Sequence, residues 1–290
     1  MRIRATVAAL SGALALSALT VPAAQADGPS FREEAAAFAA SHGAPAARSA
    51  FGAAAVGDLD VSFSDFKIAK TVKVGTTNKV STTVTYKIKH GAGVDTKSED
   101  FATGPYIYKG SYDAPVNLLL GDYAATCAAT SSTTANCSGK IDIYPAYGEL
   151  INSDAGTWKG GALALDYVTE KFADEGGLGS TLVQRYSRLT VNASPEPVKK
   201  GKTITVTGKL SRANWETGSY SGLPSGQSVA LQFRTSGTST YTNVKGVKTA
   251  AGGALKTTVT AATDGYFRFK YAGITSTAPV TAAGDFVDVR

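Results

Sequence analysis

The sequence predicts an all-β protein that contains two tandem antiparallel β-sandwiches. Apolar and polar residues alternate with period two in run after run from Asp58 to the C-terminus, which is the pattern of strands with one buried face. Turn residues separate these runs, and no helical pattern of convincing length intervenes. A proline-broken stretch, residues 188–210, divides the runs into two sets, each large enough for a sandwich.

Residues 1–26 have the features of a signal peptide. Arg2 and Arg4 form a positive n-region, residues 5–21 are an uncharged apolar run, and residues 24–26 read Ala-Gln-Ala, a small-x-small cleavage site. An uncleaved membrane anchor is the alternative, but the run is short for a span and ends in the cleavage motif. We therefore expect an extracellular, secreted protein with no membrane insertion after cleavage. The mature chain of 264 residues (290 − 26) is long enough for two domains.

The next segment, residues 27–57, is rich in Ala and Gly, unlike the alternating runs that begin at Asp58. It contains one short helical pattern, SFREEAAAFAA, in which Ser30 and Glu33 are spaced as a capping box. A helix of this length is not stable alone in water. The segment is expected to be a flexible stalk or a pro-segment that is removed.

The first predicted sandwich covers residues 58–188. Its clearest strand is KVSTTVTYKIKH, where Val80, Val84, Tyr86 and Ile88 share one face and polar residues share the other. Further runs have the same pattern, and they read PYIYKG, NLLLGDYAATCAA, CSGKIDIY, TWKGGALALDYV and STLVQRYSRLTV.

The only two cysteines of the chain, Cys127 and Cys137, flank a Ser/Thr-rich turn in this domain. An exported chain with one pair of cysteines usually oxidises it. We expect a disulfide that joins the two strands of a hairpin. A reactive thiol pair is the alternative, but that chemistry needs a lowered pKa and usually a closer spacing.

The second predicted sandwich covers residues 189–290. Between the two domains, Pro195 and Pro197 prevent a continuous central strand because each lacks a backbone donor. An alternative places the residues before the prolines in the second domain already, as its first strand, with the prolines as a kink. In GYFRFKYAG one row of alternate residues is apolar and faces inward; the outward row is Tyr266, Arg268 and Lys270.

Several stretches resemble a family of secreted actinobacterial two-domain proteins. They are LTVNASPEPVKKGKTITVTGKL, RANWET at 212–217, SVALQFR at 228–234, DGYFRFKYAG at 264–273 and, in the first domain, AGTWKGGALALD at 155–166. The resemblance implies that both sandwiches are immunoglobulin-like. It implies no defined activity, although members of the family are sometimes labelled calcium-binding. Fold alone does not supply function.

The residues needed for most enzymatic sites are missing from the sequence. The chain has two histidines, His42 in the Ala/Gly-rich segment and His90 beside a glycine turn, so a nucleophile–His pair has little support. Zinc-ligand clusters, phosphate-cradling loops and dinucleotide fingerprints are also missing. The 15 acids of the first domain leave a two-carboxylate hydrolase open by number, but nothing marks a convergent pair. We expect a non-enzyme without a cofactor.

Charge and loop aromatics favour a binding protein. Residues 58–188 hold 13 Lys/Arg and 15 Asp/Glu (net −2), whereas residues 189–290 hold 12 and 5 (net +7). Candidate contact residues are Trp215 and Tyr220 in a Gly-rich loop and the outward row Tyr266, Arg268 and Lys270. The alternatives are a solvated basic surface and a Trp215 that folds back over the sandwich end. The expected partner is an extracellular protein, a cell-wall polymer or a glycan, not nucleic acid.

Calcium is the second hypothesis, since loop carboxylates in extracellular sandwiches bind this ion. The candidate ligands are Asp58, Asp60, Asp166, Asp174 and Glu175, and the alternative is that they are solvated loop acids. The sequence thus predicts a secreted, non-catalytic binding or adhesion protein, or alternatively a calcium-binding extracellular structural protein.

Overall fold

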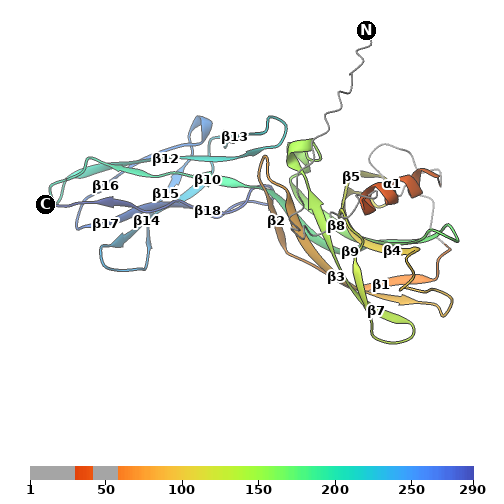
Figure 1. Cartoon of the computed structure of the whole chain (residues 1–290). Helices are drawn as coiled ribbons and strands as arrows, with labels where there is room; N and C mark the ends of the chain where they lie inside the picture. Colours follow the sequence, from red (N-terminus) through yellow and green to blue (C-terminus); the bar gives the residue numbers. More distant parts are fainter. Residues whose placement is uncertain (1–29, 42–57) are drawn as a thin grey trace, which may run out of the picture.

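The computed structural model describes residues 30–41 and 58–290. Two β-sandwiches lie end to end, with the C-terminus at the far end of the second sandwich (Figure 1). The predicted signal peptide and residues 27–29 and 42–57 of the predicted stalk lie outside the described residues, so for them both predictions stay predictions. Residues 30–41 of that segment are described, and they form a helix that packs on the first sandwich rather than a flexible stalk.

Two sheets form the first sandwich. One has the order β1-β3-β7-β6 and consists of β1 (Val61–Ile68), β3 (Val80–His90), β7 (Thr134–Ile143) and β6 (Thr126–Ala129). The other has the order β2-β9-β8-β4-β5 and consists of β2 (Thr71–Val74), β9 (Lys171–Arg185), β8 (Gly156–Asp166), β4 (Phe101–Gly110) and β5 (Pro115–Leu120). Pairing is antiparallel except between β2 and β9. Two 3-10 helices, η1 (Pro145–Tyr147) and η2 (Asn152–Asp154), lie before β8.

The core of the first sandwich lies between these sheets. The predicted inward face of β3 is confirmed, since Val84, Tyr86 and Ile88 are buried. They pack in one cluster with Trp158 and Ala162 of β8. Alternation therefore placed this strand correctly, because a half-buried strand must turn every second side chain toward the core.

The predicted disulfide is confirmed. Cys127 on β6 and Cys137 on β7 face each other directly in the ladder, with a Cα–Cα distance of 4.1 Å. The bond holds the short edge strand β6 against β7.

The second sandwich is built from β10 to β19. Its first sheet contains β10 (Ser187–Leu189), β11 (Asn192–Ser194), β12 (Thr203–Asn214), β13 (Ser219–Gly222) and β16 (Ala254–Thr260), and the other four strands all pair with β12. Its second sheet contains β15 (Thr242–Lys248), β14 (Ser228–Thr235), β17 (Gly265–Tyr271), β18 (Val280–Thr281) and β19 (Asp285–Val287). A 3-10 helix, η3 (Ala251–Gly253), precedes β16. The predicted inward row of β17, Phe267, Phe269 and Tyr271, is buried between the sheets.

The chain passes between the sandwiches at Tyr186. Because β9 ends at Arg185 and β10 already pairs with β12, the passage comes two residues before Arg188, where the sequence suggested the boundary. The prolines lie inside the second sandwich: β11 ends at Ser194, and Val198 beyond them bridges Val289 in parallel. The alternative interpretation was therefore correct, and the prolines form a kink within the first strand of that domain.

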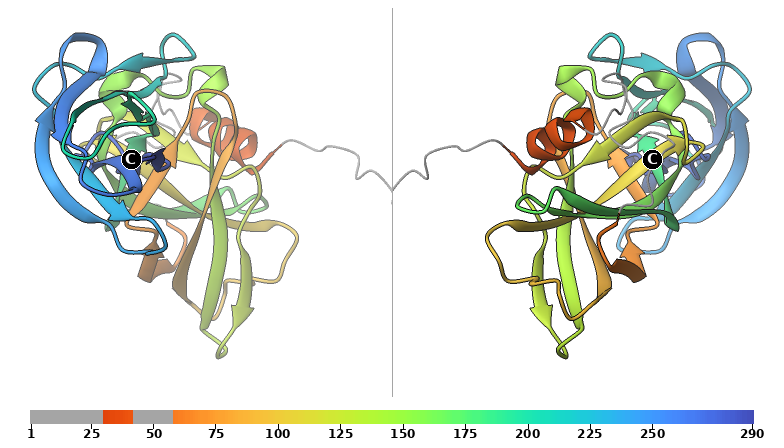
Figure 2. Two further views of the ribbon diagram at one scale, coloured as in Figure 1. Left: turned by 90° about the vertical axis from the view of Figure 1, so that its left-hand side faces the viewer. Right: turned by 90° about the vertical axis from the view of Figure 1, so that its right-hand side faces the viewer.

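Helix α1 (Phe31–Ser41) packs on the outer face of the sheet that contains β4, β5 and β8. Phe31, Ala35 and Phe38 are buried there against aromatic and aliphatic side chains of those strands. Views along the long axis show α1 on the flank of the first sandwich (Figure 2). The predicted capping box is confirmed, because the Ser30 backbone N–H donates to Glu33 Oε2 at 2.8 Å and the Glu33 N–H donates to Ser30 Oγ at 3.3 Å. No helix in the described part of the chain is long and apolar enough to cross a membrane.

Candidate functional site

The outward row of β17 lies on the open face of its sheet, opposite the buried row. Across the ladder, Tyr266 pairs with Arg234 of β14 and Arg268 pairs with Gln232. Lys270, the third residue of the predicted row, is exposed. Antiparallel sheets can leave one face in contact with solvent, and here that face carries the charged residues.

The two arginines are stacked on aromatic rings. The guanidinium carbon of Arg234 lies 3.8 Å from the ring centroid of Tyr266, and that of Arg268 lies 3.6 Å from the ring centroid of Tyr241. Phe286 of β19 extends the stack, with its ring 5.1 Å from Tyr266. We call these five residues the Arg/Tyr face. Arginine is well suited to such stacking because its guanidinium is planar and weakly hydrated.

Hydrogen bonds fix the orientation of both guanidinium groups. Arg268 Nε donates to Gln232 Oε1 at 2.9 Å, and Gln232 Nε2 donates to Asn243 Oδ1 at 2.9 Å. Arg234 Nη1 donates to the carbonyl of Thr238 at 2.6 Å. Within residues 30–41 and 58–290, neither guanidinium forms an ion pair with a carboxylate. The remaining N–H donors are therefore oriented but have no anionic partner.

This geometry suits an anionic ligand with flat apolar faces. A guanidinium fork recognises carboxylate, sulfate or phosphate oxygens with two parallel hydrogen bonds. Aromatic rings beside it offer stacking surface, since Tyr241 and Tyr266 are half-buried and Phe286 is 37% exposed. Four of the five residues stand on strands rather than on a loop, which holds their groups more precisely.

The sequence prediction found part of this face and missed the rest. Arg234 was detectable, because it stands outward in SVALQFRT, where Val229 and Leu231 are buried. Tyr241 lies in the loop before β15, where no periodicity indicates a direction. Phe286 precedes the buried Val287 on a strand of only three residues, which is too short for a pattern.

Trp215 and Tyr220 do not belong to the Arg/Tyr face. Trp215 is 4% exposed and packs in the core cluster of the first sandwich, so it is not available as a surface anchor. Its Nε1 donates to the carbonyl of Gly75 at 2.9 Å. Tyr220 is partly buried against the same cluster, and the guanidinium carbon of Arg188 lies 3.5 Å from its ring centroid. Of the predicted contact residues, Trp215 and Tyr220 therefore lie where the two sandwiches meet, whereas Tyr266 and Arg268 lie on the Arg/Tyr face.

The five candidate calcium ligands do not converge. Asp58 lies 3.8 Å from Lys171 Nζ, and Asp166 accepts the backbone N–H groups of a turn. The backbone carbonyl of Asp60 accepts a hydrogen bond from the Gly91 N–H. The Asp174 carboxylate accepts a hydrogen bond from the Tyr106 hydroxyl at 2.6 Å, and the Glu175 carboxylate accepts one from the Phe63 N–H at 3.2 Å. In the part of the chain that the structure describes, no three His, Cys, Asp or Glu side chains form a metal-binding group.

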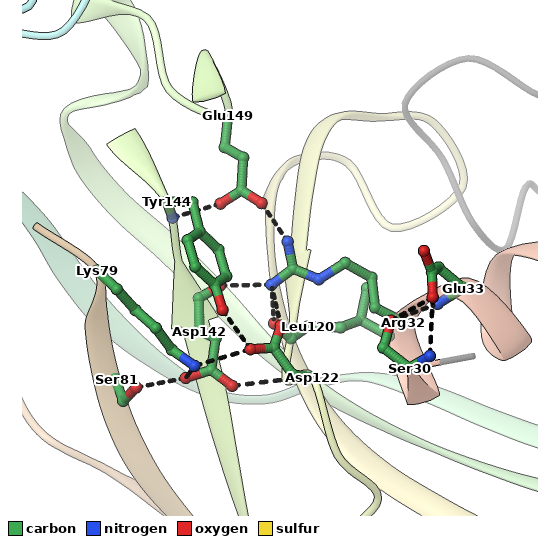
Figure 3. Close-up of polar contacts among 10 residues, drawn as sticks. All are labelled: Ser30, Arg32, Glu33, Lys79, Ser81, Leu120, Asp122, Asp142, Tyr144 and Glu149. Carbon is green, nitrogen blue, oxygen red and sulfur yellow. Dashed lines mark hydrogen bonds and ion pairs between the residues drawn. The ribbon is translucent and has the colours of Figure 1, made fainter. Parts of the chain in front are cut away.

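A second polar cluster fastens α1 to the first sandwich (Figure 3). Arg32 ion-pairs with Glu149 and donates through Nη2 to the carbonyls of Leu120 and Asp142, at 2.7 and 2.6 Å. Lys79 Nζ lies 2.7 Å from Asp122 Oδ2. Burial alone would lower the pKa of Lys79, but hydrogen bonds to Asp122, Tyr144 and Asp142 raise the pKa above its usual value. Apart from Arg32 Nε, which has no hydrogen-bond partner among the described residues, the charged groups of this cluster are paired with one another, which indicates a structural role.

Comparisons with known proteins add likenesses of fold. No family model and no curated protein matches the chain. Latent PorU from Porphyromonas gingivalis is similar at 12% identity and a TM-score of 0.28, over 79% of this chain and 20% of that chain. Fibronectin(III)-like modules of CbhA from Clostridium thermocellum are similar at 12% identity and a TM-score of 0.29, over 79% of this chain and 92% of that chain. The Escherichia coli adhesin FdeC is similar at 14% identity and a TM-score of 0.28, over 81% of this chain and 67% of that chain.

The fold prediction is confirmed: the described chain is almost entirely β and forms two antiparallel, immunoglobulin-like sandwiches. In the second sandwich, β15 joins the sheet of β14 and β17, while β16 returns to β12. Such crossings between sheets are typical of immunoglobulin and fibronectin architectures.

Proposed function

We propose that this protein is a secreted, non-catalytic binding protein whose Arg/Tyr face holds an anionic sugar polymer of the cell envelope. The observation that carries the proposal is the pair of guanidinium groups, Arg234 and Arg268, held flat against tyrosine rings with no carboxylate partner in the described chain. Sugar rings stack on the aromatic groups, and the acidic substituents of the polymer accept from the guanidinium groups.

The charge distribution supports the same partner. Residues 189–290 carry a net charge of +7, against −2 for residues 58–188. A basic domain attracts a polyanion over a distance, and salt screens that attraction. The oxidised pair Cys127–Cys137 is consistent with export, because disulfides persist mainly outside the cytosol.

The test compares the mature chain with two double variants of equal charge. Arg234→Ser with Arg268→Ser removes the stacked arginines, whereas Lys199→Ser with Lys200→Ser removes two exposed charges from a turn of the same domain. Binding is measured by affinity electrophoresis in gels that contain polygalacturonate, heparin or neutral dextran, over a series of salt concentrations. Each charge-assisted contact contributes about 1–2 kcal/mol, so the loss of two contacts should weaken binding of the acidic polymers by about 2–4 kcal/mol, which is about 30- to 1,000-fold.

The control variant should lose less than about threefold, because its charges contribute only through the screened long-range field. Equal losses in the two double variants would show that general basicity, and not the Arg/Tyr face, attracts the polymer. Equal retention of the unmodified protein in dextran and polygalacturonate would refute an anionic ligand.

A further inference from the structure

A separate group of cationic and hydroxyl side chains lies inside the second sandwich, at its end beside the first. Along β12, the residues Ile204, Val206 and Leu210 point into the core. Arg212 continues this row, so an arginine stands where the alternation calls for an apolar side chain. Its Nη1 donates to Thr277 Oγ1 at 2.8 Å, and Thr277 is fully buried.

Arg185 approaches the same place from the end of β9. It is 6% exposed, and its backbone bridges Thr277: its N–H donates to the Ser276 carbonyl at 3.1 Å and its carbonyl accepts from Ala278 at 3.0 Å. Its Nε donates to the carbonyl of Ala213. Both arginines thus contact residues 276–278, and among the described residues each is anchored through one side-chain nitrogen.

The third member is the hydroxyl of Tyr271. Tyr271 is 3% exposed, and its hydroxyl oxygen has no hydrogen-bond partner among the described residues. A buried hydroxyl without a partner costs about 1–3 kcal/mol, which makes such atoms uncommon in folded proteins. Arg212 and Tyr271 interact electrostatically, since Arg212 opposes the rise in the pKa of Tyr271 that burial causes.

The surroundings leave this group with a net positive charge. Burial lowers the pKa of Arg185 to about 10, and the neighbouring charge of Arg212 acts in the same direction, while Glu216 acts in the opposite direction. Glu216 is exposed and hydrogen-bonds to Asn152 instead. In the described part of the chain neither the buried Arg185 nor the half-buried Arg212 ion-pairs with a carboxylate, although buried charges are normally paired.

From this arrangement we infer that the end of the second sandwich binds a small monovalent anion of the halide class between Arg185, Arg212 and Tyr271. The guanidinium N–H groups are donors only, and the Tyr271 hydroxyl has its proton to donate, so the missing partner must accept hydrogen bonds. An anion satisfies all three and neutralises part of the buried charge. A halide suits a site between packed strands because it is small and imposes no directional geometry. The inference is independent of the Arg/Tyr face.

The first experiment measures the thermal stability of the mature chain at one fixed ionic strength, with chloride or bromide replacing gluconate. Gluconate is too large to enter between packed strands. The melting temperature should rise with the logarithm of the chloride concentration once the site begins to fill, as expected for a ligand that binds only the folded state. Equal melting temperatures in chloride and gluconate would overturn the inference and would leave water as the group that satisfies these donors.

Two variants assign the effect to this site. Tyr271→Phe removes only the hydroxyl, which has no partner to lose within the described protein, so the variant should fold and should show a several-fold weaker apparent chloride affinity. Arg212→Met removes one charge from the site and should abolish the chloride dependence. Arg268→Met, the control, removes an arginine from the Arg/Tyr face and should keep the full chloride dependence of the melting temperature.

Chloride-35 line broadening provides a readout that does not depend on stability. The unmodified protein should broaden the resonance, and Tyr271→Phe should reduce that broadening. Broadening that is identical in these two proteins would place the anion elsewhere and refute the assignment, even if chloride stabilises the fold.

Discussion

Trp215 offers the sharpest test of how the two sandwiches depend on each other. It comes directly after β12 of the second sandwich but completes the core of the first, where it is 4% exposed. Its Nε1 donates to the carbonyl of Gly75 at 2.9 Å, and its backbone N–H donates to Asn152 Oδ1 at 3.1 Å. We predict that Trp215→Ala destabilises the first sandwich, although the residue lies in the segment of the chain that forms the second sandwich.

The size of the effect is set by the burial of the indole. Truncation of a buried Trp or Phe to Ala costs about 3–5 kcal/mol, because transfer free energy is lost and a cavity remains. Trp215→Phe keeps most of the apolar contact and loses the hydrogen bond to Gly75, so it should cost roughly 1–2 kcal/mol. For a chain of this size each kcal/mol lowers the melting temperature by about 2–4 °C, so the alanine variant should melt roughly 6–20 °C lower.

Differential scanning calorimetry measures both variants, and the near-ultraviolet signal of Trp158 in the first core reports which sandwich unfolds. Phe286→Ala is the control, because Phe286 is partly exposed on the Arg/Tyr face and its loss should cost less than about 1 kcal/mol. A fragment that ends at residue 186 lacks Trp215 and should melt like the alanine variant. If this fragment melts like the first sandwich of the intact chain, Trp215 contributes nothing to that core and the reasoning fails.

Two further predictions concern the first sandwich. Burial raises the pKa of Asp174 to about 6, despite hydrogen bonds from Tyr106 and Tyr112 that lower the pKa. The folded state therefore binds this proton more tightly than the unfolded state does. As a result, the free energy of unfolding should fall by about 3 kcal/mol as the pH rises from about 4 to 6. Chemical denaturation at a series of pH values measures this change, and Asp174→Asn should abolish it, which stabilises the protein at neutral pH but not at pH 4. A free energy of unfolding that depends on pH as it does in the unmodified protein would contradict the pKa assignment. Arg32→Ala removes the ion pair with Glu149 and should raise hydrogen exchange in residues 31–38 but not in β12; protection equal to that of the unmodified protein would show that the apolar face of α1 suffices.

Local periodicity accounts for the features that the sequence could predict. The outward direction of Tyr266, Arg268 and Lys270 is determined by alternation with buried neighbours. Cys127 pairs with Cys137 because one turn separates two strands that must meet. Each inference uses residues within about a dozen positions of one another, so the geometry of one strand or hairpin determines the result.

The contacts that sequence reasoning missed join distant segments. Arg32 reaches Glu149 across 117 positions, and Trp215 reaches Gly75 across 140. No local pattern encodes such a pair, because the partner depends on how complete sheets and domains pack. The interpretation of residues 27–57 as a stalk or pro-segment used the composition of that segment and the short length of its helix, and neither reveals that Phe31 and Phe38 pack on an apolar surface of another element.

Trp215 and Arg268 show why similar sequence signals can have opposite meanings. An aromatic residue in a Gly-rich loop looks the same in sequence whether it contacts solvent or a neighbouring domain, and Trp215 contacts the neighbouring domain. A charged residue within an alternating strand has its direction determined by the buried residues on either side, so Arg268 had to face outward between Phe267 and Phe269. Contact residues on a regular strand can therefore be proposed from sequence with more force than contact residues on a loop. Variants at Arg234 and Arg268 should change binding with little change in stability, whereas Trp215 variants should lower stability first, so the two sets can be distinguished in one panel of measurements.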